Sequence, residues 1–208
     1  MVGFLRPVQD FSLSCGMAPS RASPHAQKLS CMSHQRILAR HDVETNRRKP
    51  IMTAKLDLFT AAPSLMKEWQ RAAFAISSSL EPSLSELVKI RASQINGCAN
   101  CLNMHTVFAR ENGETEQRIN LLPAWREAPC YTDRERAALG WTDALTRMSE
   151  GHTHEDAYDA LKTEFTEEEQ VKLTLMINVT NGYNRLAVGF SAWTDPAAVR
   201  SAAKAAAA

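Results

Sequence analysis

Apolar residues recur at helical spacing in most of the chain after residue 55. Following Pro63, the apolar positions succeed one another at intervals of three and four residues, which is the period of one helix face. These positions are Leu65, Trp69, Ala72 and Ile76. The pattern predicts an amphipathic helix that is ended by the serines at 77–79 and by Pro82.

The same period predicts further helices over about 83–95, 98–111, 115–122, 132–150 and 153–165, and one more after 166. Three of them follow a Ser/Thr-x-x-Glu sequence, which is typical of a capping box. The three pairs are Ser83 with Glu86, Thr132 with Glu135, and Thr166 with Glu169. The last helix is apolar nearly all round, so it is predicted to be buried or to lie at a subunit interface. With no strand pattern and no phosphate-binding glycine loop, the predicted fold class is all-α.

The candidate chemistry lies in residues 86–105, which read ELVKIRASQINGCANCLNMH. The pair Asn96-Gly97 is a helix-stop signal, so a new helix is predicted to begin near Cys98. Cys98 and Cys101 then lie in its first turn, where free N–H groups and the helix dipole favour a thiolate. Thiols in Cys-x-x-Cys pairs or at helix N-termini can have pKa values of roughly 3.5–7.5, against about 8.5 for a free thiol. The stretch is therefore predicted to contain a reactive sulfur.

A Cys-x-x-Cys pair has other meanings. A structural zinc site usually needs four Cys or His ligands, whereas this chain has one such pair and a nearby His. Covalent haem attachment needs His directly after the second Cys, where this chain has Leu102. The sequence thus favours redox chemistry without metal or cofactor, and leaves a metal site and a pair of inert buried thiols as alternatives.

Two further residues have both a functional and a structural interpretation. His105 follows Cys101 by four residues and so shares its helix face, which suits a proton acceptor for that thiol, although a buried core histidine is the alternative. Glu86 either orients His105 or simply caps a helix through Ser83, and periodicity alone favours the cap. Cys130, between Pro129 and Tyr131, is predicted to be a loop or packing thiol.

Composition narrows the class of protein. The 208 residues carry a net charge of +1, which indicates no nucleic acid or other polyanion as a partner, and no apolar run is long enough for a membrane span. Five cysteines with one closely spaced pair do not resemble a secreted disulfide framework, and no secretory signal is found. We therefore expect a reducing compartment, the cytoplasm.

Residues 1–51 differ from the rest of the chain. They contain eight Lys or Arg against three Asp or Glu, a net charge of +5, which leaves −4 for the remainder. Three interpretations stay open: a disordered extension, a mitochondrial-type transit peptide, which would change the predicted compartment, or translation that starts at Met52. Residues 52–195 form the predicted single domain, followed by an Ala-rich tail at 196–208.

The run from Glu86 to His105, with ASQINGC leading into the pair, resembles the core motif of the AhpD-like alkylhydroperoxidases of the carboxymuconolactone decarboxylase superfamily. The segments WTDAL and TEEEQVKLTLMINVTNGYNRLAV also resemble members of this family, and the general layout matches over about residues 52–195. The resemblance implies a helical bundle that assembles into homo-oligomers, as trimers or hexamers. It also implies a thiol peroxidase that takes a hydroperoxide substrate and an external dithiol reductant.

The resemblance assigns roles to four residues. Cys101 would attack the peroxide, Cys98 would resolve the sulfenic acid to a disulfide, and Glu86 with His105 would relay the proton through water. This moves Glu86 from a cap to a catalytic position. The best-known peroxidase of the family has a second His immediately before the attacking cysteine, where this chain has Asn100. The decarboxylases of the superfamily lack the cysteine pair. A lyase that uses His105 and Glu86 as acid and base, or a non-enzymatic redox sensor, are the alternative functions.

Overall fold

The computed structural model describes residues 54–151 and 154–197. The chain divides into two units, Met1–Ile51 and Met52–Ala208, and the described residues belong to the second. The predictions for residues 1–51 and for nearly all of the Ala-rich tail fall outside them. Within the described residues every regular element is a helix, so the predicted all-α class is confirmed. The α-helices are α2 Leu58–Ala61, α3 Pro63–Ser77, α4 Pro82–Asn96, α5 Ala99–Glu111, α6 Glu116–Leu121, α7 Asp133–Thr146, α8 Glu155–Glu164 and α9 Glu167–Phe190, with 3-10 turns η1 Leu122–Ala124 and η2 Met148–Glu150.

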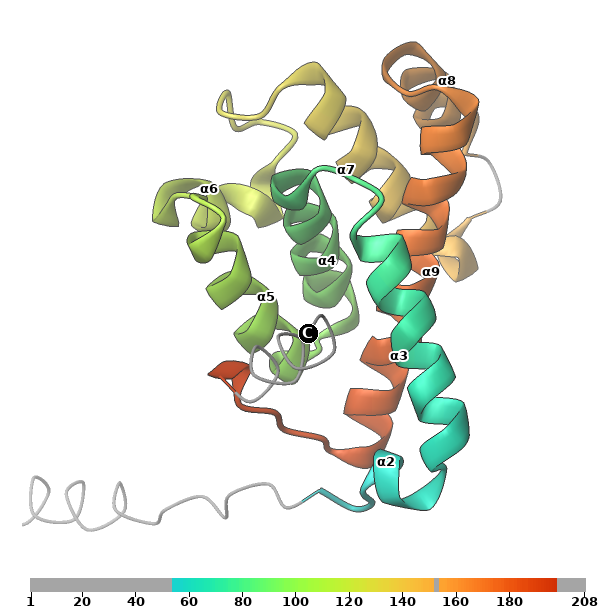
Figure 1. Ribbon diagram of the computed structural model, residues 1–208. Coiled ribbons are helices and arrows are strands. Elements are labelled where there is room, and N and C mark those ends of the chain that lie inside the picture. The colour runs from blue at the N-terminus through green and yellow to red at the C-terminus, as the bar shows by residue number, and fades with distance from the viewer. Residues whose placement is uncertain (1–53, 152–153, 198–208) are drawn as a thin grey trace, which may run out of the picture. The chain divides into compact units, whose positions relative to one another are not determined.

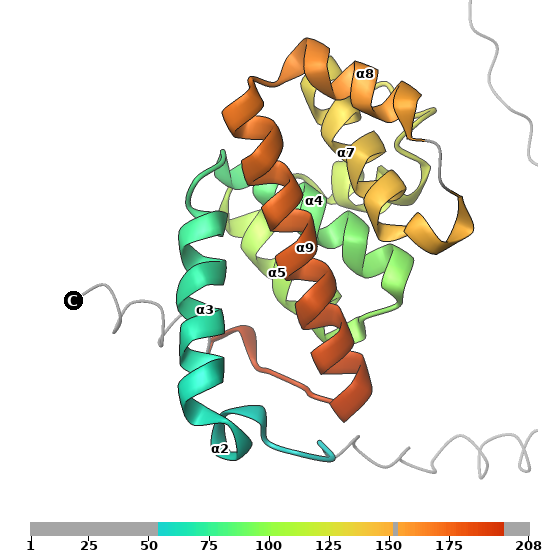
Figure 2. The same ribbon diagram turned by 90° about the vertical axis from the view of Figure 1, so that its right-hand side faces the viewer.

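The bundle is built around α4, which packs against α5, α7 and α9 (Figures 1 and 2). All residues of α4 from 84 to 93 are buried. Leu84 and Val88 join one apolar cluster with α7 and α9, while Leu87 and Ile90 join another with α5 and η1. A helix enclosed on all sides also buries its charged residues, and these require partners inside the bundle.

One of those charges is paired with a carboxylate of α7. The guanidinium of Arg91 donates to both carboxylate oxygens of Asp143 on α7, at 2.6 and 3.0 Å. Both side chains are more than nine-tenths buried. A planar guanidinium matches the two oxygens of a carboxylate, so this pair fixes the register of α4 against α7.

Two of the three predicted capping boxes are present. Thr132 with Glu135 opens α7, and Thr166 with Glu169 opens α9. The predicted box at Ser83 is wrong, because α4 already begins at Pro82. Proline at the first helical position has no N–H to satisfy and its φ suits the helix, so the helix starts before Ser83 could cap it.

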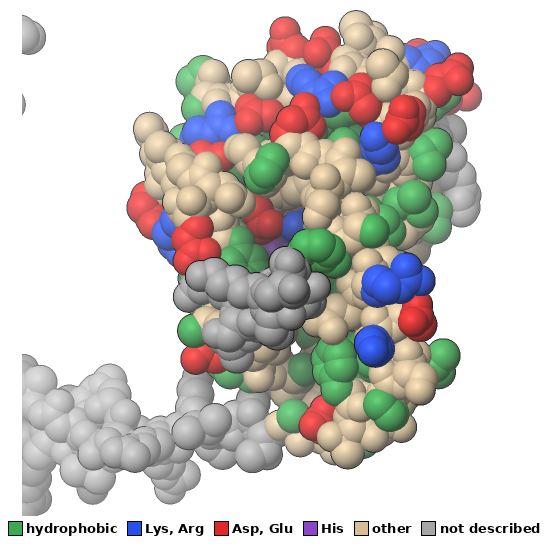
Figure 3. Space-filling model, viewed as in Figure 1, with side chains coloured by type: hydrophobic (Ala, Val, Ile, Leu, Met, Phe, Trp, Pro, Cys, Tyr) green, Lys and Arg blue, Asp and Glu red, His purple; other side chains and the backbone are tan. Residues whose placement is uncertain are grey.

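The predicted buried face of α3 is correct at Trp69 and Ile76, which are partly buried, and wrong at Leu65 and Ala72, which are exposed. Leu65 is 76% exposed, and the buried positions are Met66 and Ala73. Trp69 lies against α9 where Gly182 provides room, since a Cβ at Gly182 would fall 2.7 Å from the indole. Apolar residues occur on both faces of α3, so spacing alone did not identify the inner one. Hydrophobic side chains are accordingly visible on the outer surface along α3 (Figure 3).

The long helix α9 is buried on one side. Leu173, Met176 and Ile177 are fully buried, while Val171 and Val188 are 59% and 53% exposed. This helix was predicted to be apolar nearly all round. Its apolar residues divide into a face buried in the core and a face exposed on the surface. None of the described helices has the length and apolarity needed to cross a membrane.

Candidate active site

The chain reverses between α4 and α5 at a glycine. Gly97 ends α4 with φ +65° and ψ +31°, a left-handed conformation that costs glycine little. Cys98 follows as the N-cap of α5, and its Sγ accepts the backbone N–H of Cys101 at 3.3 Å. The predicted helix break and the predicted position of both cysteines at a helix N-terminus are confirmed.

Cys98 and Cys101 form a disulfide with a Cα–Cα distance of 5.4 Å. Their exposed fractions are 1% and 2%. Both cysteines pack against Ala187 of α9 and Ala192, which lies just after that helix. The two sulfurs predicted to react together are thus within bonding distance and shielded from solvent.

Glu86 connects α4 to α5 beside this pair. Its Oε2 accepts a hydrogen bond from Nδ1 of His105 at 2.9 Å, and its Oε1 accepts one from Nζ of Lys89 at 2.8 Å. The Glu86 and Lys89 side chains are 8% and 10% exposed, and that of His105 is 18% exposed. Glu86 is therefore a buried carboxylate with both oxygens engaged, and it points at the histidine rather than at the start of its own helix.

The ionisation of Glu86 follows from these partners. Burial alone would raise the pKa of the Glu86 carboxyl, but the hydrogen bond and charge of His105 and the ammonium of Lys89 together hold that pKa below its usual value. An ionised carboxylate can only accept, so Nδ1 of His105 carries the proton. In a neutral imidazole Nε2 is then left as the proton acceptor, one helical turn after Cys101.

Asn100, the residue immediately before Cys101, has a structural partner. It is 8% exposed, and its Oδ1 accepts the backbone N–H of Thr194 at 2.6 Å. Thr194 belongs to the segment that follows α9. Asn100 thus connects the first turn of α5 to the chain after the last helix.

An amide network holds the end of α4 to α9. Nδ2 of Asn96 donates to the side chains of Asn181 and Asn184 at 2.7 and 2.8 Å. Asn184 in turn donates to Oγ of Ser93 at 3.1 Å. These bonds fix the helix end that leads into Gly97 and the cysteines.

Sequence reasoning missed Lys89 and this network. The signal for Lys89 was its position three residues after Glu86 within an otherwise apolar run, which places both on one face. The signal for the network was the pair Asn181 and Asn184, polar at helical spacing inside a nearly apolar helix. Cys130 is a free, partly buried thiol in the loop before α7, as predicted. In the described part of the chain no three His, Cys, Asp or Glu side chains are grouped as a metal site.

Comparison with known proteins gives consistent matches. The model of the carboxymuconolactone decarboxylase family matches residues 63–144. The uncharacterized protein YdfG of Bacillus subtilis is 38% identical over 138 residues, which make up 66% of this chain and 94% of that protein. A solved structure of a protein of unknown function from Agrobacterium tumefaciens, described as a candidate antioxidant defence protein AhpD, is 42% identical with a TM-score of 0.66, and the match covers 69% of this chain and 99% of that one.

A more distant structure shares the fold. It is an uncharacterized peroxidase-related protein with an alkylhydroperoxidase AhpD core from Ralstonia eutropha JMP134, 18% identical with a TM-score of 0.58 over 66% of this chain and 74% of that one. At this identity the likeness shows the helical arrangement alone. With the sequence matches, it follows that the chain is an AhpD-like member of the carboxymuconolactone decarboxylase family.

Proposed function

We propose that this protein is a thiol-dependent alkyl hydroperoxide reductase. The observation that carries the proposal is the bonded pair Cys98–Cys101 at the start of the helix whose next turn holds His105, itself bonded to the buried Glu86. A thiol peroxidase needs a sulfur that ionises, a base to take its proton and a second sulfur within reach. Each of these requirements is met by one of the named residues.

In the reduced protein, Nε2 of His105 takes the proton of Cys101, directly or through a water molecule. The Cys101 thiolate then attacks the terminal oxygen of ROOH, the O–O bond breaks, and the leaving alkoxide takes the proton from the imidazolium. The products are ROH and a sulfenic acid on Cys101. Glu86 stabilises the imidazolium in the step between the two proton transfers.

The second half of the cycle consumes the sulfenic acid. Cys98 attacks the sulfenic sulfur, the S–O bond breaks, and the departing hydroxide takes the Cys98 proton to form water. The disulfide that results is the state seen here. An external dithiol then reduces it by thiol–disulfide exchange through a mixed disulfide.

Lys89 is assigned a supporting role in this scheme. Its ammonium donates to Oε1 of Glu86, whereas His105 is bonded to Oε2. A buried carboxylate without a countercharge would take up a proton, and a neutral carboxylic acid could no longer stabilise the imidazolium. We therefore assign Lys89 the task of keeping Glu86 ionised.

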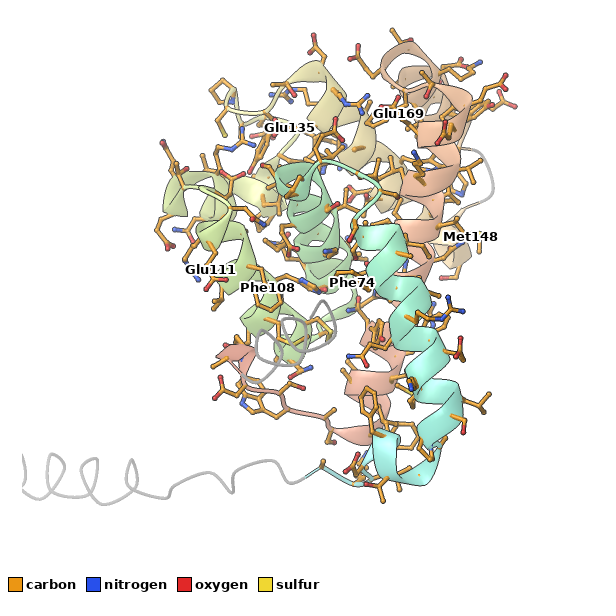
Figure 4. The ribbon with its side chains drawn as sticks, viewed as in Figure 1. Phe74, Phe108, Glu111, Glu135, Met148 and Glu169 are labelled. Atoms are coloured by element: carbon orange, nitrogen blue, oxygen red, sulfur yellow. A yellow bond between two sulfur atoms is a disulfide. The ribbon has the colours of Figure 1, made fainter. Side chains whose placement is uncertain are left out.

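The surroundings of His105 suit a substrate with an apolar body. The ring of Phe108 meets that of His105 edge-on, with 6.1 Å between centroids. Phe74, on α3, is 60% exposed, and Figure 4 labels it together with Phe108. An organic hydroperoxide is therefore favoured as the substrate class. The exposed apolar side chains of α3 and α9, Leu65 and Val171 among them, support a homo-oligomer.

The experiment is hydroperoxide consumption with cumene hydroperoxide and dithiothreitol. The proposal predicts turnover in the native protein and none in Cys101→Ser. A lyase of the decarboxylase type would use Glu86 and His105 without the sulfurs, so it would act on a lactone acid and retain that activity in Cys101→Ser. Absence of hydroperoxide consumption by the native protein would refute the peroxidase assignment.

A further inference from the structure

We propose that Asn100 and the chain after α9 form a cover over the Cys98–Cys101 disulfide, and that this cover sets how fast a thiol reductant reaches it. The cover segment is residues 191–194. The inference rests on the proposed function for its place in a catalytic cycle, since it concerns the step that resets the disulfide. Its physical claim, that one hydrogen bond controls access to the sulfurs, can be tested without any peroxide.

The first observation is burial. The cysteines are 1% and 2% exposed, so no thiolate can approach either sulfur while the surroundings stay in place. Thiol–disulfide exchange requires direct contact between the attacking sulfur and a disulfide sulfur. Something that lies on the disulfide must therefore move before reduction.

The second observation identifies what lies there. The described hydrophobic residues that cluster with the two cysteines are Ala187, in the last turns of α9, and Ala192, in the cover segment. Ala187 is part of a long helix tied to α4 through the bonds that Asn181 and Asn184 make to Asn96. The cover segment has no such helix around it, so its displacement costs less than that of α9.

The third observation is how the cover segment is held. Ser191 ends α9 with φ +54°, and this left-handed residue turns the chain back so that the N–H of Ala192 bonds to the carbonyl of Ala187 at 2.9 Å. Two residues later, the N–H of Thr194 donates to Asn100 at 2.6 Å. This hydrogen bond joins the cover segment to the residue immediately before Cys101. The side chain of Asn100 therefore serves as the latch of the cover.

This assignment gives Asn100 a task different from that of a proton-transferring residue. The amide of Asn does not ionise near neutral pH and so is no acid or base, but its oxygen accepts a backbone N–H well, as it does here. The latch would slow unspecific reduction and leave the disulfide to a reductant able to displace the segment. Asn100 and Thr194 are thus specificity-determining positions for the reset step.

The test is the rate at which dithiothreitol reduces the disulfide in the purified, fully oxidised protein, followed by thiol release. Thr194→Pro removes the N–H that donates to Asn100, whereas Thr194→Ala keeps it and is the matched control. Asn100→Ala removes the acceptor, with Asn103→Ala as the control on the same helix. One net hydrogen bond corresponds to a factor of about three to ten in the open population, so both latch variants should be reduced about three- to ten-fold faster.

Each outcome decides the matter. Faster reduction in Thr194→Pro and Asn100→Ala, with both controls at the native rate, supports the latch. Native rates in both latch variants would overturn it, and an equal acceleration in Thr194→Ala would show that the Thr194 side chain matters and not its N–H. If the native protein consumed no hydroperoxide but the reduction rates followed the predicted order, the peroxidase proposal would be refuted and the cover proposal would be supported.

Discussion

Oε2 of Glu86 lies 2.9 Å from Nδ1 of His105, and this bond joins the central helix α4 to the helix that carries both cysteines. The bond orients the imidazole and leaves its other nitrogen as an acceptor. Because Glu86 is buried and has Lys89 on its other oxygen, the histidine faces a carboxylate whose charge is fixed by its surroundings. The proposed relay thus depends on residues from two helices that the sequence separates by a chain reversal at Gly97.

The first prediction concerns the reactivity of Cys101. Replacing His105 with Ala removes the proton acceptor, so alkylation of Cys101 by iodoacetamide at pH 7 should slow about ten-fold or more. The rate should recover at high pH, where the thiol ionises without help. The measurement uses reduced protein with Cys98→Ser, so that one sulfur remains at the site. An unchanged pH profile would remove His105 from the mechanism and leave the helix N-terminus as the activator.

The second prediction concerns Lys89. Its ammonium helps to hold the pKa of Glu86 below the usual value, so Lys89→Met should raise that pKa, as measured by ¹³C NMR of the labelled carboxyl. Hydroperoxide turnover at pH 6 should fall in the same variant. Lys89→Arg, which keeps the charge, is the control and should restore both. If Lys89→Met lost activity while the pKa of Glu86 stayed as in the native protein, the role of Lys89 would be purely structural.

Much of the fold could be predicted from local signals. Pro63, the boxes at Thr132 and Thr166, and Asn96-Gly97 act within one turn of chain, so helix boundaries near them were predicted correctly. The inner face of α3 was predicted only in part, because it depends on Gly182, more than a hundred residues away, which opens space for an indole. Periodicity describes one helix at a time and does not identify its neighbour.

The site was predicted only in part, because sequence spacing relates residues within one helix and not residues on different helices. Cys98, Cys101 and His105 lie within two turns of one helix, so their spacing indicated that they share a face. That Glu86 bonds to His105 could come from the sequence only through a family resemblance, since the capping interpretation fitted the local pattern equally well. The partner of Asn100 lies 94 residues away, and no local pattern points to it.

The third prediction concerns the buried pair of Arg91 and Asp143. Asp143→Asn leaves a buried guanidinium without its carboxylate, so the free energy of unfolding should fall by about 3–5 kcal/mol. Denaturant unfolding of the oxidised protein measures this. Glu150→Gln is the control, because Glu150 pairs with Arg147 on the surface and its loss should cost less than about 1 kcal/mol. If both substitutions lowered the free energy of unfolding equally, the buried pair would contribute no more than a surface pair, contrary to this prediction.

The fourth prediction concerns acid stability through the capping box of α9. The guanidinium of Arg134 and the N–H of Thr166 lower the pKa of Glu169 from 4.5 to about 2. A carboxyl whose pKa is lower in the folded state stabilises the protein above the unfolded value, and this contribution is lost as pH falls from about 4.5 towards 2. Glu169→Gln should therefore lower the melting temperature at pH 7 and match the native protein near pH 2. Glu167→Gln, which removes an acid of the same first turn outside the capping box, is the control.

The central claim is that the two cysteines act in order, with Cys101 attacking and Cys98 resolving. The most direct measurement is intact mass and dimedone labelling of each reduced single-cysteine variant after one equivalent of cumene hydroperoxide. We expect Cys98→Ser to consume one equivalent and to carry a sulfenic acid on Cys101 that dimedone traps, while Cys101→Ser consumes none and stays unlabelled. Dimedone on Cys98 in the Cys101→Ser protein, with no label on Cys101 in the other variant, would contradict it.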